Sequence, residues 1–197
     1  MVNFLNKSRL EAFSDGVFAI IITISVLQLE VPQGDNWPAL NPVRPIFLTY
    51  IFSFIMVGIY WNNHHHMFQA VHHTTGIMLW ANLHLLFWLS LLPFATGWMG
   101  NNHFSKLPVA VYGFILFMSA FAYSLMVLTI LRSEGKDSMI AKAVRGDFKG
   151  NVSIFLYLVG IVFAFLYPVI SVTLYVVVAG IWLIPDRRIE KHSGIIE

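Results

Sequence analysis

The chain has 197 residues, of which 57% are hydrophobic and only 11% are charged, against about 25% charged residues in a typical soluble domain. Residues 45–105 contain no Lys, Arg, Asp or Glu, which excludes a soluble globular protein and indicates an integral membrane protein. The absence of cysteine excludes disulfides and thiolate metal sites, and a net charge of +2 gives no sign of a nucleic-acid partner.

We predict a single membrane domain over residues 1–197 with six apolar helical spans. The first span covers about residues 14–31, where Ser14 or Asp15 can cap the first helical turn and Pro32 closes the helix. A cleaved signal peptide is the weaker interpretation, because Asp15 interrupts the apolar stretch and no small-residue cleavage site follows. The next spans are predicted at residues 45–61, 76–95, where Pro93 breaks the end, and 107–131.

The last apolar block, residues 152–184, is either one long tilted helix or two short helices broken at Pro168. The distribution of basic residues favours two spans, at about residues 152–167 and 169–184. Of the 12 Lys and Arg residues, six spans leave only Arg44 and Lys106 on the outer side. This arrangement places both termini in the cytoplasm and obeys the positive-inside rule.

The first predicted span carries one narrow aliphatic stripe on a helical wheel. The stripe consists of Ile20, Thr23, Ile24, Leu27 and Val31. The ordinary interpretation of such a stripe is packing against neighbouring helices. Glu30 falls beside the stripe at its outer end, where it is either a solvated interfacial residue or part of an acidic ring that concentrates cations.

Ionisable groups stand at the inner edge of the first span. Arg9 and Asp15 are six residues apart and do not face each other on one helix, so we expect their partners on other spans. The candidate partners are Trp61, His64, His65 and Asn82. Three interpretations remain open for this segment: a solvated helix cap, a packing lock that positions the first helix, or a proton-binding transport site.

The segment RLEAFSD resembles the R-x-x-x-F-S-D signature of the transmembrane protein 175 family, the lysosomal potassium channels and their bacterial relatives. The matching positions are Arg9, Phe13, Ser14 and Asp15. The segment YWNNHHHMF at residues 60–68 resembles the W-x-x-H motif of that family. The segment NLHLLFWLSLLPFATGW at residues 82–98 resembles its third span.

This resemblance implies a homotetramer with a central pore lined by the first helix, in the inner membrane of a bacterium; animal members reside in endosomes and lysosomes. It implies that Ile20 forms the tightest pore layer, with Ile24 and Leu27 following as gate residues. It also favours the lock for Arg9, Phe13, Ser14 and Asp15 with their partners. Thr23 offers a hydroxyl oxygen to a partly dehydrated cation. Because the chain has no TVGYG-like filter, we do not expect a cage of backbone carbonyls.

A histidine cluster lies after the second span. It comprises His64, His65, His66, His72 and His73. Clustered imidazoles suit zinc, copper or iron, and on one continuous helix His65 and His72, or His66 and His73, would share a face. A di-iron membrane enzyme needs several histidine boxes, usually with carboxylates. This sequence has one histidine cluster and no Asp or Glu between Asp35 and Glu134, so we expect no metal site.

We therefore predict an all-α, six-span, homotetrameric channel for monovalent cations that prefers potassium. We expect no cofactor, no enzymatic activity, and no partners beyond its own copies and membrane lipid. The alternative is a proton-coupled or metal-ion transporter that uses Asp15 and the cluster from His64 to His73.

Overall fold

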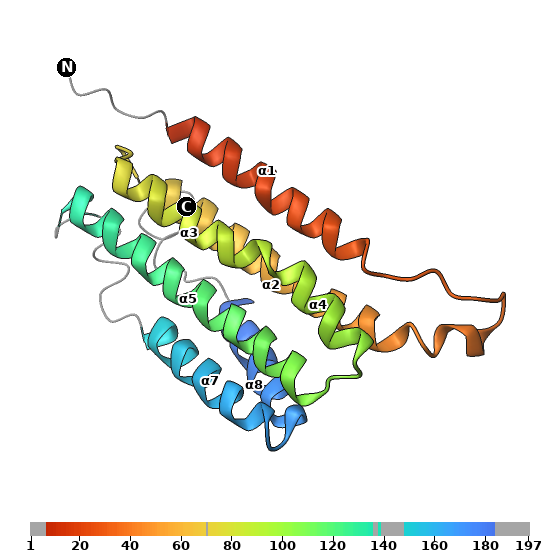
Figure 1. Ribbon diagram of the computed structural model, residues 1–197. Helices are drawn as coiled ribbons and strands as arrows, with labels where there is room; N and C mark the ends of the chain where they lie inside the picture. The colour runs from red at the N-terminus through yellow and green to blue at the C-terminus, as the bar shows by residue number, and fades with distance from the viewer. Residues whose placement is uncertain (1–6, 70, 136–137, 139–147, 184–197) are drawn as a thin grey trace, which may run out of the picture.

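The computed structural model describes residues 7–69, 71–135, 138 and 148–183, and the regular elements in this part of the chain are helices (Figure 1). In chain order they are α1 (Lys7–Val26), the short 3-10 helix η1 (Trp37–Leu40), α2 (Arg44–Gln69), α3 (Gly76–Ser90), α4 (Leu92–Asn101), α5 (Lys106–Glu134), α7 (Phe148–Ala164) and α8 (Pro168–Leu183). The predicted all-helical class is confirmed.

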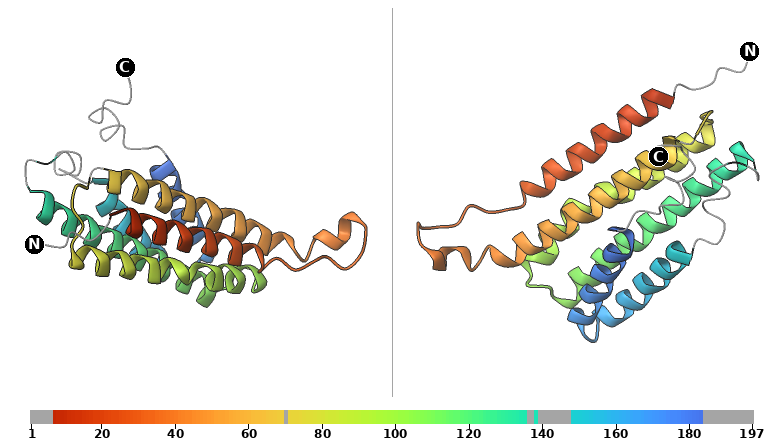
Figure 2. Two further views of the ribbon diagram at one scale, coloured as in Figure 1. Left: turned by 90° about the horizontal axis from the view of Figure 1, so that it is seen from above. Right: turned by 180° about the vertical axis from the view of Figure 1, so that it is seen from behind.

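Within the described residues, three stretches are long and apolar enough to cross a membrane: Arg44–Gln69, Gly76–Asn101 and Lys106–Glu134. Each exceeds the roughly 20 residues that a span requires. The apolar helices α7 and α8 are shorter, with 17 and 16 residues. The helices form one bundle in which α1 lies along one edge and α7 with α8 lies along the opposite edge (Figures 1 and 2).

The centre of the bundle holds buried aromatic and hydroxyl side chains. Tyr175 of α8 packs between Gly113 of α5 and Gly160 of α7, where an added Cβ would overlap its ring or hydroxyl. Ser53 of α2 lies 2.6 Å from the Thr96 hydroxyl of α4 and 2.7 Å from the Tyr112 hydroxyl of α5. These interhelical hydrogen bonds join α2, α4 and α5 where no water is available to satisfy polar groups.

The first helix begins and ends earlier than the sequence predicts. It runs from Lys7 to Val26 rather than over residues 14–31. The segment before Ser14 contains Leu, Glu and Ala, which favour helix, and Lys7 lies 3.9 Å from Glu11 one turn later. Ser14 and Asp15 therefore lie inside the helix, and their predicted role as its cap is wrong.

Beyond Val26 the backbone tightens into a turn, in which the Leu27 amide donates to the Ile24 carbonyl at 3.1 Å and the Leu29 amide donates to the Val26 carbonyl at 3.1 Å. Leu27, Glu30 and Val31 thus lie outside the regular helix. Their positions on the predicted helical wheel are wrong, although Leu27 follows α1 directly.

The second helix extends well beyond the predicted boundary at residue 61 and includes His64, His65 and His66 before it ends at Gln69. The polar side chains after Trp61 do not interrupt the helix, because the backbone hydrogen bonds of a helix form within it whatever the side chains are. Asn63 adds a bond of its own, donating its side-chain amide to the Ile59 carbonyl at 2.8 Å. Because α2 ends at Gln69, His72 and His73 do not continue its faces, and the shared face that they would have with His65 and His66 on one continuous helix does not form.

Two prolines predicted to break helices, Pro93 and Pro168, differ in their effect. Pro93 does not end the third helical stretch as predicted. It lies in the first turn of α4, where a backbone amide has no acceptor within the helix, so the missing N–H of proline has no cost there. The stretch bends at Leu91 and continues to Asn101. Pro168 is the first residue of α8, so the predicted break of the last apolar block is confirmed.

Candidate functional site

The first helix buries one face against the bundle. The buried residues are Leu10, Ser14, Phe18, Ile21 and Ser25, at helical spacing. The helix packs against α2, α3 and α4. Ser25 and Ser14 donate their hydroxyls to backbone carbonyls one turn earlier, each at 2.8 Å, so this face carries small hydroxyl groups without leaving them unpaired.

Hydrogen bonds connect the first half of this helix to two neighbours. Trp61 of α2 donates its indole N–H to the Asp15 Oδ1 at 2.9 Å. Asn82 of α3 donates its amide to the Ser14 Oγ at 2.9 Å. The Asn82 Oδ1 accepts from His64 Nε2 of α2, also at 2.9 Å, so this ring nitrogen carries a proton. We call Ser14, Asp15, Trp61, His64 and Asn82 the α1 anchor.

Most of the α1 anchor is enclosed by the protein. Ser14, His64 and Asn82 are buried, and the His64 ring packs against Phe18 and Phe68 with ring centroids 5.6 and 4.6 Å apart. A buried polar group without a partner costs about 1–3 kcal/mol, and here the three side chains satisfy one another. The anchor thus fixes the position of α1 against α2 and α3 at one height along the bundle.

Three residues predicted to join this network lie outside it. His65 stacks on Trp61 with ring centroids 6.0 Å apart and accepts from the Gln69 amide at 2.9 Å, without reaching Ser14 or Asp15. Phe13 is exposed on α1. Arg9 is exposed too, and within the described residues it forms no ion pair with Asp15.

Two contacts at the same end of the bundle had no clear signal in the sequence. Lys7 donates its ammonium to the Val71 carbonyl at 3.1 Å and reaches the Gln69 carbonyl at 3.4 Å. The Glu134 carboxylate accepts from the backbone amide of His72 at 2.9 Å. Both contacts join groups more than 60 residues apart in the chain and hold the connection between α2 and α3 from two sides.

The opposite face of α1 is largely left exposed by the described residues. Ile20 is 58% exposed and Ile24 is 43% exposed, and Leu27 just after the helix is 74% exposed. Thr23 is exposed between the two isoleucines and donates its hydroxyl to the Ala19 carbonyl at 2.9 Å. Its oxygen lone pairs therefore remain available on an otherwise aliphatic surface.

The outer end of this face continues into an open hollow between α1 and α4. Its lining includes Ile24, Gln28, Phe94, Gly97 and Trp98. The Gln28 side chain lies against Gly97, where no Cβ blocks it. Glu30 is exposed beyond the end of α1, so the aliphatic face passes into a polar surface at this end.

The histidines are dispersed rather than gathered around one point. His64 belongs to the α1 anchor, and His72 contributes only its backbone amide to the contact with Glu134. His84 accepts from the Trp88 indole at 2.9 Å within α3. Among the described residues, no three His, Asp or Glu side chains lie close enough together to hold a metal ion.

The sequence of this chain is similar to a known protein family and to named members of it. The family described as "Endosomal/lysosomal potassium channel TMEM175" matches residues 9–93, which include the whole α1 anchor. A protein of Chryseobacterium sp. (strain P1-3), named as a potassium channel, is 58% identical over 187 residues, covering 95% of this chain and 97% of the relative. The bovine "Endosomal/lysosomal proton channel TMEM175" is 33% identical over 150 residues, covering 67% of this chain and 31% of the longer animal protein.

The fold agrees with the same comparison. The crystal structure of a lysosomal potassium-selective channel TMEM175 homologue from Chamaesiphon minutus matches with a TM-score of 0.76 and 26% identity, over 91% of this chain and 97% of that one. The members of this family are ion channels and not enzymes. The prediction drawn from Arg9, Phe13, Ser14 and Asp15 is confirmed: the chain belongs to the TMEM175 family as a bacterial member.

Proposed function

We propose that the protein is a monovalent cation channel that prefers potassium and acts in the bacterial inner membrane. The proposal is supported by relatives named as potassium channels, one of them 58% identical over almost the whole chain. The long apolar helices support a location in the membrane. Potassium enters this proposal as the permeant ion, and the activity needs no bound cofactor.

We further propose that four copies assemble around a central pore, each with six spans and cytoplasmic termini. The observation that carries this proposal is the exposed aliphatic face of α1. Helix α1 lies along one edge of the bundle (Figure 1), and its Ile20 and Ile24 are exposed. A homotetramer would bring four such faces together around one axis, where a short row of side chains per subunit suffices to close a pore.

In this arrangement Ile20 and Ile24 form aliphatic rings that gate the pore by excluding water. An ion cannot give up its hydration shell at such a ring without replacement ligands. Leu27 adds a further apolar layer at the start of the turn after α1. Opening then requires α1 to rotate or move outward, away from the axis.

Thr23 and Glu30 supply the polar groups of the proposed pore. Because the Thr23 hydroxyl donates its proton to Ala19, its oxygen can coordinate a partly dehydrated cation between the two isoleucine layers. Glu30 would form a ring of carboxylates at the outer mouth that raises the local cation concentration.

We assign the α1 anchor a positioning role. Asp15 is engaged by the Trp61 indole and Ser14 by Asn82, so these groups hold α1 at a fixed height while its other face lines the pore. Arg9 and Phe13, exposed in the single chain, are available for contacts between subunits. This use of Asp15 and His64 differs from the alternative, in which they carry protons or metal ions during transport.

A liposome flux assay tests the proposed function. Purified protein is reconstituted with a potassium gradient and a membrane-potential dye, and the wild type is compared with Ile20→Asn and with Ile170→Asn, a control isoleucine exposed on α8. We expect potassium flux in the wild type, a several-fold larger leak for Ile20→Asn, and wild-type flux for the control. A pH dye in the same vesicles reads proton movement; flux of protons without potassium would contradict the potassium channel.

A further inference from the structure

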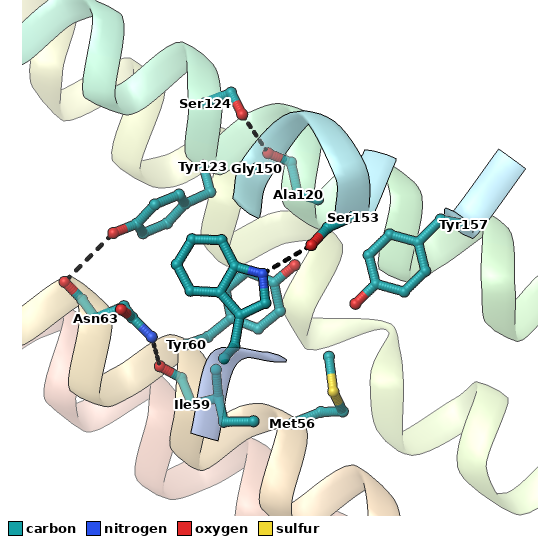
Figure 3. Close-up of a pocket in the computed structure, with 11 residues that line it drawn as sticks. Met56, Ile59, Tyr60, Asn63, Ala120, Tyr123, Ser124, Gly150, Ser153 and Tyr157 are labelled. Carbon is teal, nitrogen blue, oxygen red and sulfur yellow. Dashed lines mark hydrogen bonds between the residues drawn. The ribbon is translucent and has the colours of Figure 1, made fainter. Parts of the chain in front are cut away.

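A pocket lies between α2, α5, α7 and α8, away from α1 (Figure 3). Its lining consists of Met56, Ile59, Tyr60, Asn63, Ala120, Tyr123, Ser124, Gly150, Ser153, Tyr157 and Trp182. The space inside is about 40 Å³, against about 10–15 Å³ for a single water molecule on the same measure. The pocket therefore accommodates a small group of a few non-hydrogen atoms, and a longer molecule could extend from its mouth.

Two tyrosine hydroxyls in this pocket have no hydrogen-bond partner among the described residues. Tyr60 of α2 and Tyr157 of α7 are 8% and 1% exposed, and Figure 3 shows both rings extending toward the interior of the pocket. Within the described residues, neither hydroxyl makes a hydrogen bond. In the part of the chain that the structure describes, the fully enclosed polar side-chain atom without a partner is Ser171 Oγ, so the two phenol oxygens are not completely enclosed. A buried tyrosine hydroxyl normally finds a partner.

Several other donors of the lining already make hydrogen bonds within the protein. Trp182 donates its indole N–H to the Ser153 Oγ at 2.8 Å, and Ser153 donates to the Lys149 carbonyl at 2.8 Å. Asn63 and Ser124 donate to carbonyls of their own helices. No lining residue carries a charged side chain, so an ionic ligand would lose its hydration without compensation.

The position of the pocket suits a molecule with an apolar chain. The ring centroids of Tyr123 and Trp182 lie 6.3 Å apart in an edge-to-face arrangement. Both residues are partly exposed and form one side of the pocket. Tyr and Trp are typical of the interface between lipid and water, where ester carbonyls and glycerol hydroxyls of lipids lie. Met56, Ile59 and Ala120 supply apolar walls.

We propose that this pocket binds the uncharged oxygen-bearing end of a neutral amphiphile, with the Tyr60 and Tyr157 hydroxyls donating to its oxygen. A long-chain alcohol and the glycerol ester region of a lipid share this chemistry. The proposal concerns binding alone and does not depend on the conducted ion.

Photoaffinity labelling of the purified full chain tests the proposal. The probe is a long-chain alcohol that carries a diazirine, and the labelled residues are mapped by peptide mass spectrometry. The double variant Tyr60→Phe with Tyr157→Phe removes only the two hydroxyls. The control is Tyr167→Phe, which removes the hydroxyl of an exposed tyrosine between α7 and α8.

We expect labels on pocket residues of α2, α7 and α8, at least fivefold less label in the double variant, and no change in the control. Unlabelled alcohol and diacylglycerol serve as competitors in separate arms. Displacement by diacylglycerol identifies a lipid site, and displacement by the alcohol alone identifies a site for free amphiphiles. Labels outside the pocket, or equal labelling of wild type and double variant, would overturn the proposal.

Discussion

Asn82 is the residue on which the α1 anchor depends most, because its amide group serves two helices at once. Its nitrogen donates to Ser14 of α1 and its oxygen accepts from His64 of α2. All three side chains are buried. Loss of this one amide leaves the buried His64 N–H without its acceptor and removes the donor to Ser14, which keeps its own bond to the Leu10 carbonyl. A buried donor without a partner is more costly than the loss of an exposed hydrogen bond.

We predict that Asn82→Ala lowers the stability of the folded protein by about 1–3 kcal/mol and reduces the yield of assembled oligomer. Thermal unfolding in detergent, followed by size-exclusion chromatography, measures both effects. Asn101→Ala, an exposed residue at the end of α4, is the control and should behave as wild type. If Asn82→Ala assembled normally and changed only ion preference, the positioning role of the anchor would be wrong.

Thr23 is the residue at which ion preference is predicted to be set. Thr23→Val keeps the shape of the side chain and removes its oxygen, so we expect the preference for potassium over sodium to fall at least severalfold. Thr23→Ser retains the hydroxyl and should keep most of the preference. Reversal potentials in mixed potassium and sodium solutions measure the change; equal preference in Thr23→Val and wild type would exclude this residue from selectivity.

At the scale of helices, the bundle depends on close contacts that only glycine permits. Tyr175 of α8 inserts where Gly113 of α5 and Gly160 of α7 leave space, and its hydroxyl donates to the Val109 carbonyl at 3.4 Å. An extra methyl group in a filled interior typically costs about 1–3 kcal/mol. This contact fixes α8 against α5 and α7.

Gly113→Ala should therefore destabilise the protein by about 1–3 kcal/mol, because its Cβ overlaps the Tyr175 hydroxyl. Gly180→Ala is the matched control on α8, since a Cβ added there meets nothing within 4 Å. Alanine also favours helix over glycine, so the control should unfold at or slightly above the wild-type temperature. Thermal unfolding of the two variants side by side separates packing from helix propensity.

Most of the helices could be predicted from the sequence, but most of their ends could not. Pro168 removes a backbone donor and correctly predicts a helix boundary. Ser14 and Asp15 are typical cap residues, yet the helix continues through them because their side chains find partners on α2 and α3. The polar run after Trp61 resembles a loop in composition, whereas burial of His64 keeps it helical.

The candidate site, too, could be predicted only in part from the sequence. That Ile20, Thr23 and Ile24 share one face follows from helical periodicity, which needs only local information. That this face is exposed does not follow from periodicity, which is equally consistent with packing against neighbouring helices. Which residues meet Ser14 and Asp15 depends on the packing of helices far apart in sequence. Of the four predicted partners, Trp61, His64 and Asn82 lie in the network and His65 does not. The contacts of Lys7 with Val71 and of Glu134 with His72 have no local pattern and emerge only from the fold.

At the scale of the whole molecule, the described residues leave the aliphatic face of α1 largely exposed. Apolar side chains gain no stability by facing one another rather than lipid, so assembly must rest on shape and polar contacts between subunits. We predict that native mass spectrometry gives a complex of four 22.4 kDa chains. A stable monomer or dimer that still conducts potassium would contradict the homotetramer.

The central claim is that the exposed face of α1 lines a water-filled pathway, and cysteine accessibility tests it most directly. The natural chain has no cysteine, so single variants need no altered background. A membrane-impermeant thiol reagent should block the potassium current of Thr23→Cys and of Ile20→Cys in the open channel, and leave Ile170→Cys on α8 unaffected. Full current in both α1 variants after complete exposure to the reagent, with the thiols unmodified, would contradict the account.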